Sequence, residues 1–136
     1  MINLLVISHS DLAHGLLSAA GLIVGEVPHA ASMGLYPGKA FDEFVAEVGE
    51  KIKSMDEGDG VLVLVDLFGG TPSNATLYSR GALGDSVNYK VVSGANLPML
   101  LEAHIAREGM TLDELKDHCV AQGADGVKDV FKELGF

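Results

Sequence analysis

Three short polar segments carry the side chains that could transfer a chemical group, and each segment separates an apolar run from a helical pattern. They are residues 8–10 (Ser-His-Ser), 66–72 (Asp-Leu-Phe-Gly-Gly-Thr-Pro) and 93–98 (Ser-Gly-Ala-Asn-Leu-Pro). In open parallel sheets, ligands bind outside the carboxyl ends of the strands. We therefore expect the three segments to lie together at one edge of a sheet.

His9 and Asp66 are the pair with the clearest chemistry, provided that the strands before them are neighbours. A neutral imidazole has one donor and one acceptor nitrogen. A carboxylate that accepts from Nδ1–H fixes the tautomer, leaves the Nε2 lone pair free and stabilises positive charge on the ring. Because imidazole can itself be the nucleophile, we predict that His9 accepts a phosphoryl group and that Asp66 orients and stabilises it.

The residues around this pair suit the binding of a phosphoryl group. Gly69 and Gly70 let the backbone come close, Thr71 can donate its hydroxyl, and helix N-termini supply amide N–H groups. We expect Ser10, Gly69 and Gly70 to bind the phosphoryl group, Thr71 to donate a hydrogen bond to it, and no metal or cofactor to take part. Taken singly, these features are ordinary loop and turn residues. Their joint placement at strand ends favours the functional interpretation.

The remaining ionisable side chains have ordinary interpretations. Asp11 fits the first turn of a helix, where its charge would slightly oppose a nearby phosphoryl group, and it receives no role. The single cysteine, Cys119, cannot form an internal disulfide and fits a core thiol. The other histidines lack metal-ligand spacing, and we expect them to be structural or solvated: His14, His29, His104 and His118.

Apolar periodicity predicts alternating strands and helices along the chain. Strands are predicted at residues 2–7, 31–35, 61–65 and 87–92. Helices are predicted at residues 12–23, 41–55 and 98–106, and Gly25 should end the first of them. Two further helices are predicted to start at Pro72, with Thr71 as cap, and at a capping box that begins with Thr111. This order implies a parallel sheet covered on both faces. The tail 126–136 is ambiguous, because its apolar residues have helical spacing but its length also suits a strand.

Composition and charge narrow the class of protein. The chain has 136 residues, 48% of them hydrophobic, which suits one domain, residues 1–136, with its own core. Nine basic and nineteen acidic residues give a net charge of −10, which opposes binding to nucleic acid or anionic membranes. No apolar run approaches the roughly 20 residues of a membrane span. The start has no basic leader, so we expect a cytoplasmic domain.

Three ordered motifs resemble those of the IIA component (EIIA) of the mannose-class sugar phosphotransferase system, whose members include mannose, fructose and sorbose types. Residues 7–10 resemble its phosphorylation-site turn, residues 65–74 its most recognisable motif, and residues 94–100 a third. Pro37-Gly38 and residues 126–128 also match the family pattern. The resemblance extends over essentially the whole chain.

The resemblance implies a fold and a set of partners. The fold would be a doubly wound, mainly parallel α/β sheet of order 2-1-3-4, with a final antiparallel strand exchanged within a homodimer. His9 would accept phosphate from the phosphocarrier protein HPr and donate it to a IIB domain. That domain phosphorylates a sugar entering through the membrane proteins IIC and IID. Asp66 would be the hydrogen-bond partner of His9, and Thr71 would match a hydroxyl residue near the phosphoryl site.

Two departures and three alternatives accompany the resemblance. Leu67 stands where some members carry a hydroxyl residue, so no polar role transfers to it. We also expect the IIB partner to be a separate chain, because no linker follows Phe136.

A IIA-like phosphodonor of a dihydroxyacetone kinase is the nearest alternative function. A receiver domain phosphorylated on Asp66 would need an acidic pair in residues 8–10. A flavodoxin-like binding module would need hydroxyl residues there and an aromatic pair to hold a ring.

Overall fold

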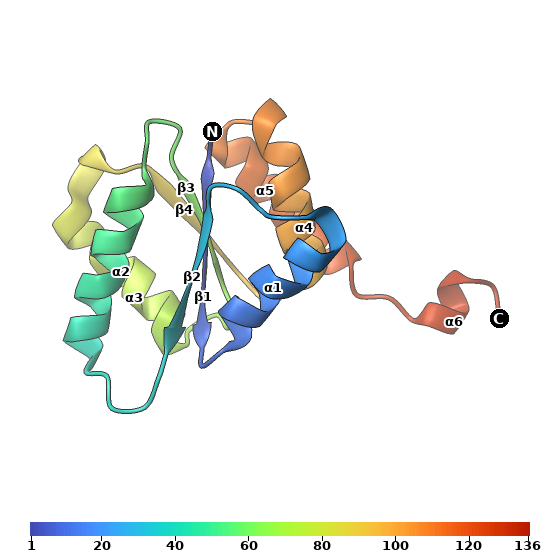
Figure 1. Ribbon diagram of the computed structural model, residues 1–136, viewed down its shortest axis with the longest axis horizontal. Helices are drawn as coiled ribbons and strands as arrows, with labels where there is room; N and C mark the ends of the chain where they lie inside the picture. The colour runs from blue at the N-terminus through green and yellow to red at the C-terminus, as the bar shows by residue number, and fades with distance from the viewer.

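The apolar runs form one parallel sheet in the computed structural model, which describes all 136 residues (Figure 1). Its strands are β1 (Asn3–His9), β2 (Ala30–Leu35), β3 (Val61–Val65) and β4 (Tyr89–Ser93). The strand order is β2-β1-β3-β4, and each neighbouring pair is parallel. The expected order 2-1-3-4 is confirmed, and the strands before His9 and Asp66 lie side by side in the middle of the sheet.

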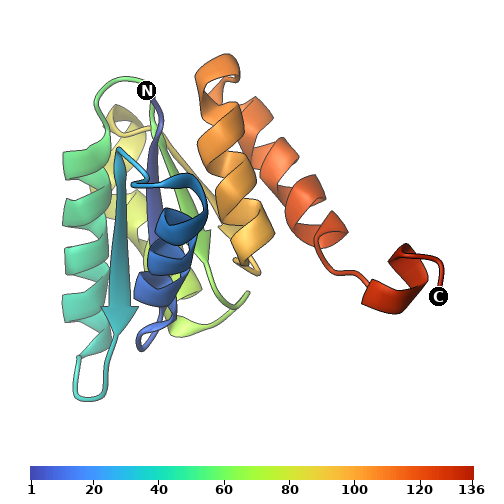
Figure 2. The same cartoon turned by 45° about the vertical axis from the view of Figure 1, so that its right-hand side comes forward.

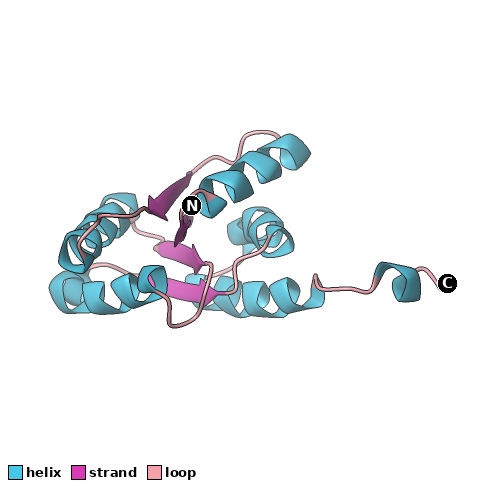
Figure 3. Cartoon of the chain, turned by 90° about the horizontal axis from the view of Figure 1, so that it is seen from below, coloured by secondary structure: helices cyan, strands magenta, loops and turns pink.

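Helices cover both faces of the sheet, as Figures 1 and 3 show. One face carries α1 (Leu12–Val24), α4 (Leu97–Ala106) and α5 (Leu112–Asp125), and the other carries α2 (Phe41–Met55) and α3 (Thr71–Leu83). Leu4 and Val6 of β1 enter the first core, while Leu5 and Ile7 enter the second, because successive side chains of a strand point to opposite faces. Burial on both faces explains the continuous apolar runs. None of the chain's helices combines the length and apolar character needed to span a membrane.

The predicted helices form, and their boundaries lie within one residue of those expected. Gly25 ends α1 in the left-handed region, at φ 82°. Helix α3, however, begins at Thr71 with Gly70 as its N-cap, so the prediction that Thr71 caps the helix is wrong. The Gly70 N–H donates to the Leu67 carbonyl (3.1 Å), and this tight turn brings the chain into the helical conformation one residue early.

Strand β1 continues beyond its apolar run and includes His9 as its last residue. Ser8 and His9 stay in the sheet because they pair in register with Gly34 and Leu35 of β2. The Ser8 side chain is buried, and its hydroxyl accepts from the Ala13 N–H at the start of α1 (2.7 Å). The histidine is therefore positioned by strand geometry, and not by a loop after the strand.

The C-terminal tail leaves the body of the molecule after α5 (Figures 1 and 2). It contains one short helix, α6 (Val130–Glu133). Its apolar side chains are exposed, among them Val127 (81%), Phe131 (72%) and Phe136 (91%). Strand exchange requires the sheet edge of a second subunit, so that expectation stays a prediction.

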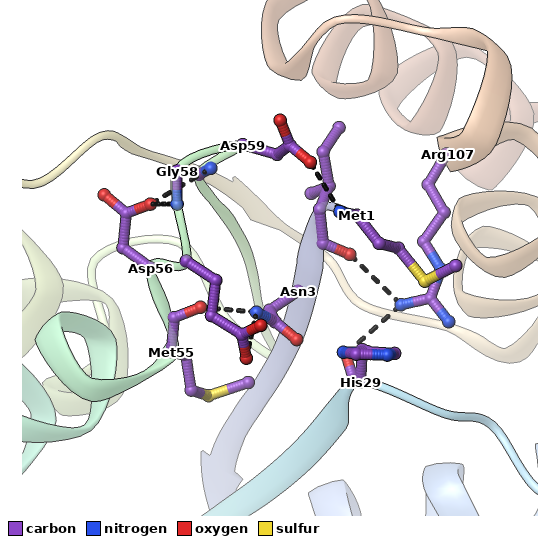
Figure 4. A network of polar contacts seen from close by, with 11 residues as sticks. Met1, Asn3, His29, Met55, Asp56, Gly58, Asp59 and Arg107 are labelled. Carbon is purple, nitrogen blue, oxygen red and sulfur yellow. Dashed lines mark hydrogen bonds and ion pairs between the residues drawn. The ribbon is translucent and has the colours of Figure 1, made fainter.

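A network of polar contacts holds the edge of the sheet at which the strands begin (Figure 4). Arg107 is 3% exposed and donates to the carbonyls of Ile2 and His29, both at 3.2 Å, which links the start of β1 to the start of β2. Asp56 organises the loop before β3 by accepting from three backbone N–H groups: Gly58 (3.0 Å), Gly60 (3.2 Å) and Asn88 (3.0 Å). This loop is therefore built around one carboxylate.

We predict that Asp56→Asn lowers the free energy of unfolding by about 1–2 kcal/mol, as expected when charge-assisted hydrogen bonds that water partly screens are weakened. Burial raises the pKa of Asp56, but the N–H groups of Asn88, Gly58 and Gly60 together lower it more, so the net pKa lies below its ordinary value of 3.8. The carboxylate therefore stabilises the fold above pH 3.8, and this contribution is lost as the pH falls through the lowered pKa. Urea unfolding at pH 7 and at successively lower pH measures both effects.

The matched control is Asp59→Asn, because Asp59 lies in the same loop but its side chain is 63% exposed and pairs with the chain's amino terminus. It should destabilise the fold less than Asp56→Asn. A difference between wild type and Asp56→Asn that persisted unchanged at the lowest pH would contradict the role given to the ionised carboxylate.

Candidate functional site

The first two polar segments meet at the carboxyl edge of the sheet, where β1 and β3 end side by side. Asp66 directly follows β3. Its Oδ2 accepts from the backbone N–H of His9 (2.9 Å) and lies 2.8 Å from Nδ1 of the same residue. One carboxylate oxygen thus holds both the backbone and the ring of His9, which brings together the two residues predicted to pair.

Asp66 and His9 differ in how far their side chains are buried. The Asp66 side chain is 11% exposed and the His9 side chain is 48% exposed. Burial raises the pKa of Asp66, but the backbone and ring N–H groups of His9, with the ring's charge, together lower it more, so the net pKa lies below the ordinary 3.8. Asp66 is therefore a carboxylate at neutral pH. As an acceptor, it requires a neutral His9 to carry its proton on Nδ1, which leaves the Nε2 lone pair free.

Two adjacent glycines serve this site for different reasons. Gly69 has φ 78°, a left-handed conformation in which a side chain would be strained although nothing lies within 4 Å of its Cβ position. Gly70 is needed for space, because a Cβ there would lie 3.0 Å from Cε1 and 3.6 Å from Nε2 of His9. The Gly70 N–H is already engaged with the Leu67 carbonyl. The absence of a side chain at Gly70 therefore leaves open space beside Nε2 of His9.

The other two predicted site residues flank the pair. Thr71 is half-buried and is the first residue of α3, next to Gly70. Ser10 directly follows His9, is exposed and has φ 50°. Its N–H donates to the carbonyl of Leu35 in β2 (2.8 Å), so this amide points toward β2 and is not free for a ligand.

The third polar segment supports the fold near the site. The Ala95 N–H donates to the carbonyl of Val65, the last residue of β3 (3.0 Å). Asn96 caps α4 by accepting from the Met99 N–H (3.0 Å), and its amide donates to the Gly123 carbonyl (3.0 Å). These bonds hold α4 and α5 against the end of β3, and none of them reaches His9.

Asn74 is a supporting residue that received no role in the sequence-based predictions. Its side-chain amide donates to the Gly69 carbonyl (3.2 Å), and its backbone N–H donates to the Gly70 carbonyl (2.9 Å). It thereby ties the glycine turn to the first turn of α3. Its spacing of four residues from Gly70, one helical turn, is the signal that could have indicated this contact.

The ionisable residues away from this edge behave as structural groups. Cys119 is fully buried, and burial, with a smaller contribution from the charge of Glu102, raises the pKa of its thiol to about 11. His118 pairs with Glu102 between α5 and α4 (3.0 Å), and His14 contacts the hydroxyl of Ser32 (2.6 Å). No three His, Cys, Asp or Glu side chains gather in a way that could hold a metal ion.

Fold and site together define a doubly wound α/β protein that presents a histidine–aspartate pair at the carboxyl edge of its sheet. The model of the EIIA-man family, described as PTS system fructose IIA component, matches residues 3–120. The chain therefore belongs to the EIIA-man family of phosphotransferase system (PTS) IIA components, which confirms the resemblance found in the motifs.

Individual relatives agree with this family assignment. The mannose-specific EIIAB component of Escherichia coli (strain K12) is 34% identical over 128 residues, which cover 93% of this chain and 39% of that protein. This chain thus spans about two fifths of the length of that relative. The fructose-specific EIIA component of Bacillus subtilis (strain 168) is 30% identical over 121 residues, 89% of this chain and 81% of the relative. The crystal structure of EIIA from Streptococcus agalactiae superposes with a TM-score of 0.87 at 28% identity and covers 97% of this chain and 99% of its own.

We predict that Asp66→Ala redistributes the proton of neutral His9 between its two ring nitrogens, because the only acceptor that holds it on Nδ1 is lost. Long-range ¹H–¹⁵N correlation spectra of histidine-labelled protein distinguish the two tautomers. Glu102→Ala is the matched control, since it removes the carboxylate that contacts His118 at 3.0 Å. The control should alter the His118 signals alone. If the Nδ1–H signal of His9 survived Asp66→Ala, the hydrogen bond would not determine the tautomer.

Proposed function

We propose that this chain is a phosphoryl carrier of the phosphoenolpyruvate-dependent sugar phosphotransferase system, with His9 as the phosphoacceptor. The observation that carries the proposal is the hydrogen bond between Nδ1 of His9 and Asp66 (2.8 Å), which leaves Nε2 beside the open space at Gly70. Membership of the EIIA-man family supports it. The donor is the phosphocarrier protein HPr, and the acceptor is a IIB domain or subunit that serves the membrane proteins IIC and IID, with the carrier itself in the cytoplasm.

The chemistry needs only one nucleophile and one charge partner. The Nε2 lone pair attacks phosphorus, the bond from phosphorus to the donor breaks, and the electron pair of that bond stays with the donor. The His9 ring keeps its Nδ1 proton and becomes positively charged as the Nε2–P bond forms. The Asp66 carboxylate stabilises that charge, in the manner of the aspartate in a Ser-His-Asp triad. Thr71 donates its hydroxyl to a phosphoryl oxygen, and donation to IIB reverses these steps.

The surface around His9 suits transfer between two proteins. His9 is half-exposed, so a partner can bring its own reacting atom to Nε2 without an opening motion. Exposed apolar side chains occur on the segments that carry the pair, namely Leu12 (49% exposed) at the start of α1, and Leu67 (59%) and Phe68 (85%) directly after Asp66. Leu67, which lacks the hydroxyl of some family members, thus contributes apolar contact area to the docking of a partner.

The homodimer with an exchanged tail is also a proposal, and two features of the chain favour it. β4 is the last strand of the order β2-β1-β3-β4, so one of its edges has no neighbouring strand. Beside it lies a groove of about 580 Å³ whose lining includes Tyr89, Val91 and Arg80. The exposed apolar residues of the tail would be covered if the tail paired with this edge of a second copy, and the edge itself would be protected from other pairing.

We predict that His9→Ala abolishes phosphoryl uptake while the fold persists, because no other histidine lies at a strand end with a carboxylate partner. The protein is incubated with phosphoenolpyruvate, enzyme I and HPr, and its intact mass is measured; circular dichroism checks the fold. The matched control is His14→Ala, which removes an exposed histidine of α1 and should leave uptake unchanged. A phosphorylated His9→Ala protein would refute the assignment.

The stability of the adduct distinguishes the histidine from the aspartate as acceptor. A phosphoramidate on His9 survives alkali and hydrolyses in acid, whereas an acyl phosphate on Asp66 is cleaved by hydroxylamine. A hydroxylamine-labile, alkali-labile adduct would support the receiver-domain alternative. Onward transfer to a dihydroxyacetone kinase, in place of IIB, would support the other alternative within the family.

We predict that deleting residues 126–136 converts a dimer into monomers or aggregates, as measured by light scattering at micromolar concentration. Phe131→Asp should weaken the dimer in the full-length chain, because it places a charge where the tail packs on the partner. Leu22→Asp, at a 90% exposed position of α1, is the control and should leave the assembly unchanged. A monomeric full-length protein under these conditions would exclude the exchange.

A further inference from the structure

Asp11 places a carboxylate two residues away from the phosphoaccepting histidine. It is the N-cap of α1, a position from which a side chain ordinarily accepts from N–H groups of the first helical turn. Its side chain makes no capping bond, because the buried Ser8 hydroxyl already accepts from the Ala13 N–H (2.7 Å). The Asp11 carboxylate is therefore available to another partner. Its charge is unfavourable to a phosphoryl group, which itself carries close to two negative charges.

Tyr36 is the hydrogen-bond partner of Asp11. The Tyr36 hydroxyl donates to Oδ1 of Asp11 (2.6 Å) and thereby joins the loop after β2 to the turn after β1. The hydrogen bond to Asp11 raises the pKa of Tyr36, with further increases from burial and from the negative charge of Asp11. The phenol therefore stays protonated at neutral pH and remains a donor to the carboxylate.

The backbone on both sides of this bond directs Asp11 toward β2. Ser10 has φ 50°, a conformation that residues other than glycine rarely adopt, and its N–H donates to the Leu35 carbonyl (2.8 Å). Gly34 lies beneath this turn, because a Cβ there would come within 2.4 Å of the Ser10 carbonyl oxygen and 2.8 Å of the Tyr36 ring. The bare backbone of Gly34 thus lets the turn and the ring approach each other.

The His9 ring lies on the β3 side of β1, opposite to the side on which Asp11 meets Tyr36. Its Nδ1 lies 2.8 Å from Asp66, which follows β3, and the ring lies beside the position that a Cβ of Gly70, the residue before α3, would take. Since β2 and β3 flank β1 on opposite sides, the bond between Asp11 and Tyr36 lies on the β2 side and the phosphoryl position lies on the β3 side. We propose that Tyr36 is a positioning residue that holds the negative charge of Asp11 away from the phosphoryl group on His9. This inference rests on the proposed phosphoryl transfer.

The test compares the rates at which wild type and three variants take a phosphoryl group from phospho-HPr in quenched-flow experiments. Tyr36→Phe keeps the ring over Gly34 but removes the donor. It should lower the rate at saturating donor about tenfold, because the freed Asp11 carboxylate repels the incoming phosphoryl group. The defect should grow at low salt, where the freed carboxylate is less screened. Adding Asp11→Asn to Tyr36→Phe should restore the rate, because the amide has no charge. Tyr78→Phe, at an exposed tyrosine of α3, is the matched control.

Each outcome has a separate meaning. If the wild-type protein takes no phosphoryl group, the proposed function itself fails. If wild type is phosphorylated and Tyr36→Phe reacts at the same rate, the inference alone is overturned. A slow double variant would also overturn it, because a purely structural contact between the two loops is not rescued by removing a charge.

Discussion

The parallel pairing of β1 with β3 is the constraint on which the rest of this structure depends. Ile7 lies opposite Val65 in the register of the two strands, and both side chains are completely buried. His9, two residues beyond Ile7, and Asp66, one residue beyond Val65, therefore emerge next to each other at the same edge. A slip of one residue would move every side chain of a strand to the opposite face and would separate the pair. The apolar core thus determines the site geometry, although neither His9 nor Asp66 belongs to it.

Elements whose bounds depend on one segment alone could be predicted from the sequence. The helix 41–55 and the strand 61–65 were predicted to the residue, because each has a clear apolar period and a clean boundary. The alternation of continuous apolar strands with amphipathic helices also predicted a parallel sheet. The strand order came from the family resemblance, because periodicity does not say which strands are neighbours.

Strand pairing and side-chain contacts that depend on a second segment could not be predicted from a single segment. β1 includes Ser8 and His9 because β2 supplies Gly34 and Leu35 as partners. Neither polar residue predicts a strand by itself. Gly70 resembles an ordinary turn glycine in the sequence, and only the fold shows that the His9 ring lies 3.0 Å from the position of its Cβ. The contact of Asp11 with Tyr36 joins residues 25 positions apart and has no local signal. Each of these features is a tertiary contact, which local propensity does not contain.

The two bonds from His9 to a single oxygen of Asp66 have a consequence for how the ring meets its partners. A half-exposed side chain ordinarily samples several rotamers, and ordering it when another protein docks costs about 0.5–1.5 kcal/mol. Here the backbone N–H and Nδ1 close a small ring through one acceptor, so the rotamer is selected when the chain folds. In the proposed function the chain meets a donor and then an acceptor in every cycle, and a mobile ring would lose that conformational entropy at both encounters. With these two bonds the loss occurs once, at folding, and the proposed encounters would both begin with the imidazole already aligned.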